Sequence, residues 1–286
     1  MREIRTICVV GTGTMGRGIA QNAATSGYDV VMVDAAEAQL ASAMAALRET
    51  LDGLVAKGKL ADEARAAALA RLRSAASLDE GVRAADLVVE AVPESLDLKR
   101  AIFREADAAA PVHAVLATNT SSLPVGEIAR ATRRPERVVG MHFFNPVPVM
   151  TLLEVVRASE TSDGALAAAV AVGRSMGKDP IVVKDAPGFA TSRLGVLLGL
   201  EAMRMLEQGV ASAEDIDKAM TLGYRHPMGP LRLTDLVGLV VRLAIAEHLS
   251  QALRSEAFRP PDILRRMVAA GKLGKKSGEG FYRWDA

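Results

Sequence analysis

The stretch Thr6–Gly18 reads TICVVGTGTMGRG. Its first part, Thr6–Val10, is a short apolar run rich in β-branched residues, which is typical of a strand buried on both faces of a parallel sheet. Gly11, Gly13 and Gly16 follow with G-x-G-x-x-G spacing, and good helix formers come after them. The stretch therefore predicts a buried strand, a tight turn and a helix, in that order.

Three glycines with this spacing suit a loop that holds a dinucleotide. One makes the tight turn, the second lets the backbone approach a pyrophosphate, and the third lets helix and strand pack closely. A second apolar strand, expected over Asp29–Val33, ends in Asp34, where such folds place the acid that bonds the ribose hydroxyls. Because an acid there repels a 2′-phosphate, the sequence predicts NAD rather than NADP. A glycine-rich turn that binds nothing is the simpler interpretation, but it explains neither the second strand nor Asp34.

The composition limits the class of protein. The chain has 286 residues, half of them apolar, and a formal net charge of +1, which suits one large domain or two and gives no electrostatic case for a nucleic-acid partner. Charges interrupt every long apolar stretch, so no membrane span is expected. The first strand begins within a few residues of Met1, which leaves no room for a signal peptide. The single cysteine, Cys8, lies inside that strand, and these features together favour a cytoplasmic protein with a buried thiol.

Strand-like and helical segments alternate through the first two thirds of the chain. This alternation predicts an α/β protein of Rossmann type, with a doubly wound parallel sheet. Further strands are expected at Asp86–Val92, Ala114–Ala117, Val138–Met141, Leu152–Val156 and Ile181–Val183, and helices at 95–109, 124–132 and 163–176.

A long helical pair interrupts the alternation after Asp34. Helices are expected over Ala35–Ala56 and 62–76, with a break at Lys57-Gly58-Lys59. The pair is longer than a strand crossover requires, so it predicts a projecting helical arm. Lys57 and Lys59 flank its tip, where they are either solvated surface lysines or contacts for an anionic ligand.

The sequence changes character at residues 184–188, KDAPG. Beyond this point strand patterns give way to helical ones, which predicts a domain boundary near residue 185: an NAD-binding domain over 1–185 and an all-helical substrate and dimerisation domain over 186–286. Helices are expected at 189–207, 212–221, 230–254 and 261–270. The apolar content of this second part exceeds what a small core needs, so a homodimer interface is expected there.

Polar side chains follow three of the expected strands. Ligands in open α/β sheets bind at the carboxyl ends of strands, and Glu94, Ser121 and His142 stand just beyond three such ends. A histidine can remove the hydroxyl proton when an alcohol is oxidised by hydride loss. A carboxylate can orient the imidazole and stabilise its charged form, and a hydroxyl can hold the reacting oxygen.

Each of these three side chains could instead have a purely structural role. Glu94 and Ser121 could cap helices, and His142 could be a buried core histidine. Their joint position beside a dinucleotide loop favours the catalytic interpretation, with Glu94 as the carboxylate partner of His142. No metal site is expected, because the chain lacks a cysteine and histidine cluster and an HExxH motif.

A series of motifs runs in order from Val9 to Tyr282. They are GTGTMGRGIAQ, VVEAVPE, ATNTSSL, GMHFFNPVPVM, DAPGF, ASAEDIDKAM, HPMGP and GKKSGEGFY. With them the chain resembles the short-chain L-3-hydroxyacyl-CoA dehydrogenases, a family that includes bacterial 3-hydroxybutyryl-CoA dehydrogenases and serves fatty acid metabolism. The combination of MHFFNP with TNTSS is far more specific than the glycine loop alone.

The resemblance implies a role for each matching residue. His142 looks like the catalytic base of the family, Glu94 like its partner carboxylate, and Ser121 like the hydroxyl that contacts substrate and nicotinamide. The arm would reach the CoA moiety through Lys57 and Lys59. The residues implied to line the cofactor site are Gly11, Gly13, Thr14, Met15, Gly16, Asp34, Glu94, Lys99, Asn119, Asn145 and Lys276.

The chain departs from the family pattern at three positions. After PGF the family usually has V-N-R with an asparagine facing the acyl substrate, whereas this chain has Ser192 there. A hydroxyl is shorter than a carboxamide and offers fewer hydrogen bonds, so Ser192 either acts through a water or marks a different substrate. Arg232 replaces a usual acidic residue, and Gly53 makes the arm less basic.

The sequence thus predicts an NAD-dependent dehydrogenase that interconverts a 3-hydroxyacyl-CoA and its 3-oxo form, acting as a homodimer. The three departures keep an alternative open, an NAD-dependent dehydrogenase of a free hydroxy acid on the same fold. A third interpretation is a cofactor-binding structural or regulatory protein with a decayed site. The presence of Glu94, Ser121 and His142 argues against it.

Overall fold

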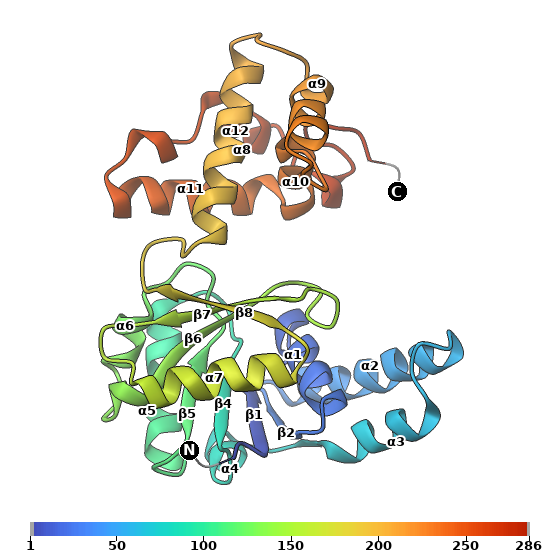
Figure 1. The fold of residues 1–286 in the computed structure, drawn as a ribbon, viewed down its shortest axis with the longest axis vertical. Helices are drawn as coiled ribbons and strands as arrows, with labels where there is room; N and C mark the ends of the chain where they lie inside the picture. The colour runs from blue at the N-terminus through green and yellow to red at the C-terminus, as the bar shows by residue number, and fades with distance from the viewer. Residues whose placement is uncertain (1–2, 285–286) are drawn as a thin grey trace. The chain divides into compact units, whose positions relative to one another are not determined.

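The computed structural model describes residues 3–284, which divide into two compact units, one ending at Ala186 and one starting at Pro187 (Figure 1). The first unit contains an eight-stranded sheet in the order β3-β2-β1-β4-β5-β6-β7-β8. Its strands are β1 (Thr6–Val10), β2 (Asp29–Val33), β3 (Leu72–Ser74), β4 (Leu87–Glu90), β5 (Val115–Thr118), β6 (Val138–Phe143), β7 (Leu152–Arg157) and β8 (Asp179–Lys184). All neighbouring strands are parallel except β6 and β7, which are antiparallel. The predicted α/β fold is confirmed.

Helices cover both faces of this sheet (Figure 1). One face packs against α1 and α7, and the other against α4, α5 and α6. The central strands are buried on both sides, as their continuous apolar runs predict. The helices of this unit are α1 (Thr14–Thr25), α2 (Glu37–Ala56), α3 (Asp62–Arg71), α4 (Leu78–Val82), α5 (Leu96–Ala109), α6 (Val125–Ala129) and α7 (Asp163–Ser175), with a short 3₁₀ turn at Pro135–Arg137.

The helical arm is formed by α2 and α3, which project past the β2 and β3 side of the sheet (Figure 1). An ion pair between Asp52 and Arg65 joins the two helices. Gly58 adopts a left-handed conformation, φ +64°, in the turn between them. The expectation that the second helix continues to residue 76 was wrong, because the chain leaves the helix after Arg71 and β3 pairs along the edge of β2.

The second unit is helical, as predicted. It consists of α8 (Thr191–Glu207), α9 (Ala213–Lys218), a π turn at Ala219–Gly223, α10 (Pro230–Val237), α11 (Leu239–Leu253) and α12 (Asp262–Ala269), with 3₁₀ turns at Glu256–Phe258 and Lys275–Ser277. The single helix expected over 230–254 is in fact two helices bent by 103° at Gly238. Gly238 has φ +97°, a conformation that residues with a Cβ rarely adopt. Within residues 3–284 no single helix is both long and apolar enough to span a membrane. Only the bent pair of α10 and α11, taken together, has the length and apolar composition of a span.

Arg232, one of the three departures from the family pattern, has a structural role. Its guanidinium carbon lies 5.4 Å from the ring centre of Tyr282 and 4.8 Å from that of Trp284. Asp235 accepts hydrogen bonds from the backbone of Phe281 and Tyr282 and from Nε1 of Trp284. Arg232 thus stacks on the C-terminal segment that Asp235 holds against α10, so its presence needs no change of substrate.

Candidate active site

A cavity of about 740 Å³ lies beside the glycine loop, at the carboxyl ends of β1 and β2. Its walls come from the loop, from the end of β2, and from residues after β3 and β4. Five residues predicted to bind the cofactor line it: Gly11, Gly13, Thr14, Met15 and Asp34. This is the edge of the sheet at which such folds bind ligands.

The glycine loop leaves the space that a pyrophosphate requires. Gly11 has φ +91°, and a methyl group on it would lie 2.8 Å from the carbonyl oxygen of Ala91. A methyl group on Gly16 would lie 1.8 Å from the carbonyl oxygen of Gly11, so only glycine lets the helix begin so close to the turn. A methyl group on Gly13 would meet no atom within 4 Å, so the backbone there is open to a ligand. The loop fits the phosphates of a dinucleotide.

Hydrogen bonds fix the carboxylate of Asp34 just after the end of β2. Its Oδ2 accepts hydrogen bonds of 2.8 Å from the backbone N and from Oγ1 of Thr12, and its Oδ1 accepts one of 3.1 Å from the backbone N of Ala36. Partial burial acts to raise the pKa of Asp34, but the hydrogen bonds from Ala36 and Thr12 outweigh it and lower the pKa overall. The carboxylate is therefore ionised at neutral pH, as discrimination against a 2′-phosphate requires.

We expect Asp34→Ala to weaken NAD binding and to reduce the preference for NAD over NADP. A hydrogen bond to a charged group contributes about 1.5–3 kcal/mol, so the KM for NAD should rise by about tenfold or more. The measurement is the ratio of kcat/KM for the two cofactors. Asp34→Asn is the matched control, since it keeps the side-chain size but removes the charge. An unchanged ratio in both variants would show that Asp34 only braces the loop.

His142 is buried in β6 and pairs with a carboxylate of the neighbouring strand. Its side chain is 10% exposed. Glu154 of β7 stands opposite His142 in the antiparallel register, and its Oε2 lies 2.7 Å from Nδ1 of the imidazole. Glu154 is fully buried. An ionised carboxylate can only accept, so Nδ1 carries the hydrogen and Nε2 is the basic nitrogen of the neutral ring.

The assignment of Glu94 as the partner of His142 is corrected by this geometry, because Glu154 occupies that position. The sequence pattern of residues 152–156 predicts only a strand that extends the sheet and gives no role to Glu154. Two signals were available: a lone acid inside the apolar run LLEVV, and a link of eight residues, 144–151, between β6 and β7. Such a link is too short for a parallel crossover, so it favours an antiparallel pair.

Glu94 instead organises the loop after β5. Its Oε1 accepts hydrogen bonds from Oγ1 of Thr120 at 2.5 Å and from the backbone N of Ser121 at 3.1 Å. The hydroxyls of Ser121 and Ser122 lie 3.5 and 3.4 Å from the same oxygen. The structure therefore brings Glu94 and Ser121 together, as the sequence predicts, but with Glu94 fixing the position of the serine.

Lys99 lies in the interior next to this loop and does not line a cleft. Its side chain is fully buried, and Nζ lies 2.6 Å from Oε1 of Glu90 and 3.4 Å from Oε2 of Glu94. Glu90 also accepts a hydrogen bond from Oγ1 of Thr118. Lys99 thus pairs with Glu90 and Glu94, and its fully buried side chain has no exposed surface for the expected direct contact with the cofactor.

The remaining predicted residues are placed as follows. Asn119 directly follows β5, and its Oδ1 accepts a hydrogen bond of 2.8 Å from the backbone N of Phe143. Asn145 is exposed just after β6, in a cis peptide bond with Pro146. Lys57 and Lys59 are exposed at the tip of the arm.

Two predicted site residues belong to the helical unit. Ser192 is half-buried in the first turn of α8, and Lys276 is exposed in a 3₁₀ turn. Their approach to cofactor or substrate stays a prediction.

Other chemistries have little support in residues 3–284. No group of three or more His, Cys, Asp or Glu side chains is placed there to hold a metal ion. Burial raises the pKa of the Cys8 thiol to about 12, so the thiol does not ionise at neutral pH.

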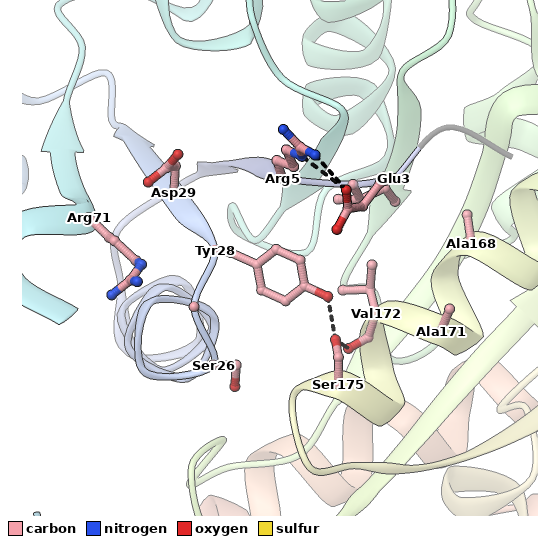
Figure 2. A pocket seen from close by; sticks show the side chains of 12 residues that line it. Glu3, Arg5, Ser26, Tyr28, Asp29, Arg71, Ala168, Ala171, Val172 and Ser175 are labelled. Atoms are coloured by element: carbon pink, nitrogen blue, oxygen red, sulfur yellow. Dashed lines mark hydrogen bonds and ion pairs between the residues drawn. The ribbon is translucent and has the colours of Figure 1, made fainter. Parts of the chain in front are cut away.

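A second cavity, also of about 740 Å³, opens at the amino ends of β1 and β2 (Figure 2). Four of its polar side chains form two pairs: Tyr28 and Ser175 face each other and share a hydrogen bond, and Arg5 pairs with Glu3. It lies at the opposite edge of the sheet from the glycine loop and His142, so we do not assign cofactor binding or catalysis to it.

Comparison with known proteins agrees with this geometry. Residues 6–186 match the sequence model of the NAD-binding domain of 3-hydroxyacyl-CoA dehydrogenase, and residues 188–284 match that of its C-terminal domain. The chain belongs to the 3-hydroxyacyl-CoA dehydrogenase family. It is therefore an NAD-dependent oxidoreductase, and the predicted cofactor is confirmed.

Members of the family match this chain over its whole length. A probable 3-hydroxybutyryl-CoA dehydrogenase of Bacillus subtilis is 43% identical over 283 residues, which cover 99% of this chain and 98% of that protein. A 3-hydroxybutyryl-CoA dehydrogenase of Mycobacterium tuberculosis is 42% identical, covering 98% and 99%. The crystal structure of (S)-3-hydroxybutyryl-CoA dehydrogenase from Ralstonia eutropha superposes with a TM-score of 0.95 at 44% identity, covering 99% and 100% of the two chains.

Proposed function

We propose that this protein interconverts a short 3-hydroxyacyl-CoA and its 3-oxo form, with His142 as the general base and acid. The buried contact between His142 and Glu154 carries the proposal, because it fixes the hydrogen on one ring nitrogen and so makes the other the basic one. The 3-hydroxybutyryl-CoA dehydrogenases that match this chain support the substrate class.

The proton transfer follows from the tautomer. Nε2 of His142 accepts the proton of the substrate hydroxyl as the C3 hydrogen leaves with its electron pair, so that the C–O bond becomes a carbonyl. Bound NAD supplies the hydride acceptor. Glu154 stabilises the imidazolium that forms, at a distance of 2.7 Å. In the reverse direction the imidazolium returns the proton to the carbonyl oxygen.

Ser121 is proposed to hold the reacting oxygen. Its hydroxyl belongs to the loop that Glu94 fixes through Thr120 and the Ser121 backbone. Because that loop rests on the buried Lys99, the serine is held by a rigid support and needs little reorganisation during the reaction.

Basic groups of the first unit are proposed to bind the CoA moiety. A small cavity lies between α1, α2 and the residues after Asn145. Arg17 lines it, and among residues 3–284 the buried Nε of Arg17 has no hydrogen-bond partner. An unpaired cation beside a cavity suits a phosphate group. Lys57 and Lys59, at the tip of the arm, are the second set of candidates.

A homodimer through the helical unit is also proposed. Apolar side chains are exposed on three of its helices, α8, α10 and α11, and a second copy of the chain would cover them. They are Leu194, Leu198, Leu233, Leu236, Val237, Val240 and Val241.

The test of the proposed function is a comparison of acetoacetyl-CoA with free acetoacetate. We expect NADH to be consumed with the thioester at a kcat within the usual enzyme range of about 1–10³ s⁻¹, and kcat/KM to be at least about a hundredfold lower for the free acid, which lacks every CoA contact. A preference for the free acid would instead support a dehydrogenase of free hydroxy acids. Binding of NADH, seen as a thermal shift, without turnover of either compound would contradict both activities.

A further inference from the structure

Lys178, between α7 and β8, is a buried cation without an acidic partner. It is 7% exposed. Its Nζ donates hydrogen bonds to the carbonyl oxygens of Val147 and Met150, the latter at 2.9 Å. Within residues 3–284 no carboxylate pairs with Lys178, and burial lowers its pKa. Because burying an unpaired ammonium group is costly, an apolar side chain would suit this position better if it only had to fill space. The contacts with the two carbonyls are what the ammonium group adds.

The two carbonyls belong to the loop of residues 144–151, which joins β6 to β7. This loop closes the hairpin that carries His142 on one strand and Glu154 on the other. Since β7 is antiparallel to β6 and parallel to β8, the start of β8 lies at the edge of the sheet where β6 ends. Lys178 therefore anchors the 144–151 loop at the edge where the candidate site lies.

The same loop packs against α1, the helix that follows the glycine loop. Val147 is buried, and a methyl group on Gly18 of α1 would lie 3.0 Å from its Cβ. Asn22 of α1 donates a hydrogen bond of 3.1 Å to the carbonyl oxygen of Met176, two residues before Lys178. Both the turn that carries Lys178 and the loop that it anchors are thus attached to α1.

The 144–151 loop forms one wall of the small cavity beside Arg17. The other walls come from α1 and α2, and the loop residues that line the cavity are Asn145, Pro146, Val147 and Pro148. Lys178 holds the loop at Val147, within this wall, and at Met150, just behind it. The position of the wall opposite Arg17 therefore depends on the two carbonyls that Lys178 binds.

We propose that Lys178 is a positioning residue for substrate binding, which sets the width of the cavity where a phosphate group of CoA meets Arg17. This inference rests on the proposed function and explains how the first unit would favour CoA thioesters over shorter ones. Replacing the ammonium group by an apolar one would leave two carbonyls without their donor and release the loop. The backbone pairing of β6 with β7 holds His142 opposite Glu154 independently, so the proton transfer does not need Lys178.

The test compares acetoacetyl-CoA with acetoacetyl-N-acetylcysteamine, a thioester that lacks the phosphates. Lys178→Met keeps a side chain of similar length but removes its donors. We expect it to lower kcat/KM for acetoacetyl-CoA by about tenfold or more, mainly through KM, which is the scale of one hydrogen bond to a charged group. The kcat/KM for the short thioester should stay at the value of the wild type. Lys178→Gln, which keeps an N–H donor without the charge, should fall between them and is the second variant if the methionine variant misfolds.

A double variant tests whether Lys178 acts through the cavity. Arg17→Met should lower the preference for acetoacetyl-CoA by removing the cation itself. Adding Lys178→Met to it should then cost little more, because both changes weaken one contact. Full multiplication of the two losses would contradict the proposed route through Arg17.

Val172→Ala is the control for a general loss of stability. Val172 is buried in α7 of the same unit and lies outside the 144–151 loop. Its truncation should lower Tm and leave the ratio of the two thioesters as in the wild type. An unchanged ratio in folded Lys178→Met would overturn the proposal, as would an equal fall of the ratio in Val172→Ala. If the wild type reduces neither thioester, the proposed function itself fails.

Discussion

His142→Ala is expected to lower kcat for 3-hydroxybutyryl-CoA oxidation by about 10²–10⁴-fold, the usual contribution of a general base. The imidazole is the group whose unprotonated nitrogen can take the hydroxyl proton, and no neighbouring strand offers a second histidine in its place. KM should change less than kcat, because the proton transfer matters mainly in the transition state. Steady-state rates of NADH formation, in the presence of saturating NAD, measure both.

The control for His142→Ala is another histidine with a carboxylate partner. His113 lies 2.9 Å from Oδ1 of Asp86 at the amino ends of the strands, away from the glycine loop. His113→Ala should keep turnover near that of the wild type. Since His142→Ala leaves the buried Glu154 without its imidazole, His142→Gln is needed as a second variant, and both should be shown to be folded by their Tm. Near-complete turnover in either folded variant would contradict the mechanism.

Glu154→Gln is expected to lower kcat by at least about a hundredfold although Glu154 touches no substrate. An amide can donate to Nδ1, and the ring then presents a protonated Nε2 that cannot act as a base; the equivalent change in a Ser-His-Asp triad costs about 10⁴-fold. Glu94→Gln is the comparison, because Glu94 is the partner that the sequence predicts for His142. It should mainly disturb the position of Ser121, and its loss of kcat should be clearly smaller. A larger loss in Glu94→Gln than in Glu154→Gln would return the partner role to Glu94.

Much of the fold could be predicted from local pattern. The observed bounds of β1 and β2 are those expected from the apolar runs on either side of the glycine loop. The arm and the helical character of the second unit also follow from periodicity. Periodicity does not predict the break at Gly238, because a glycine inside an apolar helical run is compatible with a continuous helix. It breaks the helix here because its φ is positive.

The candidate site was predicted less completely, for a physical reason. Glycine loops and strand ends depend on residues that are close in sequence, so the sequence could predict the cofactor cavity and His142. The run LLEVV does not by itself fix the direction of β7, which only the short link from β6 indicates. The antiparallel direction of β7 decides that Glu154 stands opposite His142.

A double-mutant cycle on His142 and Glu154 tests the proposed mechanism most directly. If Glu154 acts only by holding and charging His142, then Glu154→Gln should cost nothing further once His142 is alanine, so the double variant should have the kcat of His142→Ala. We expect this complete non-additivity, together with unchanged NAD binding in all three variants. Multiplied losses, with the double variant slower than His142→Ala by the full factor of Glu154→Gln, would contradict the role given to Glu154.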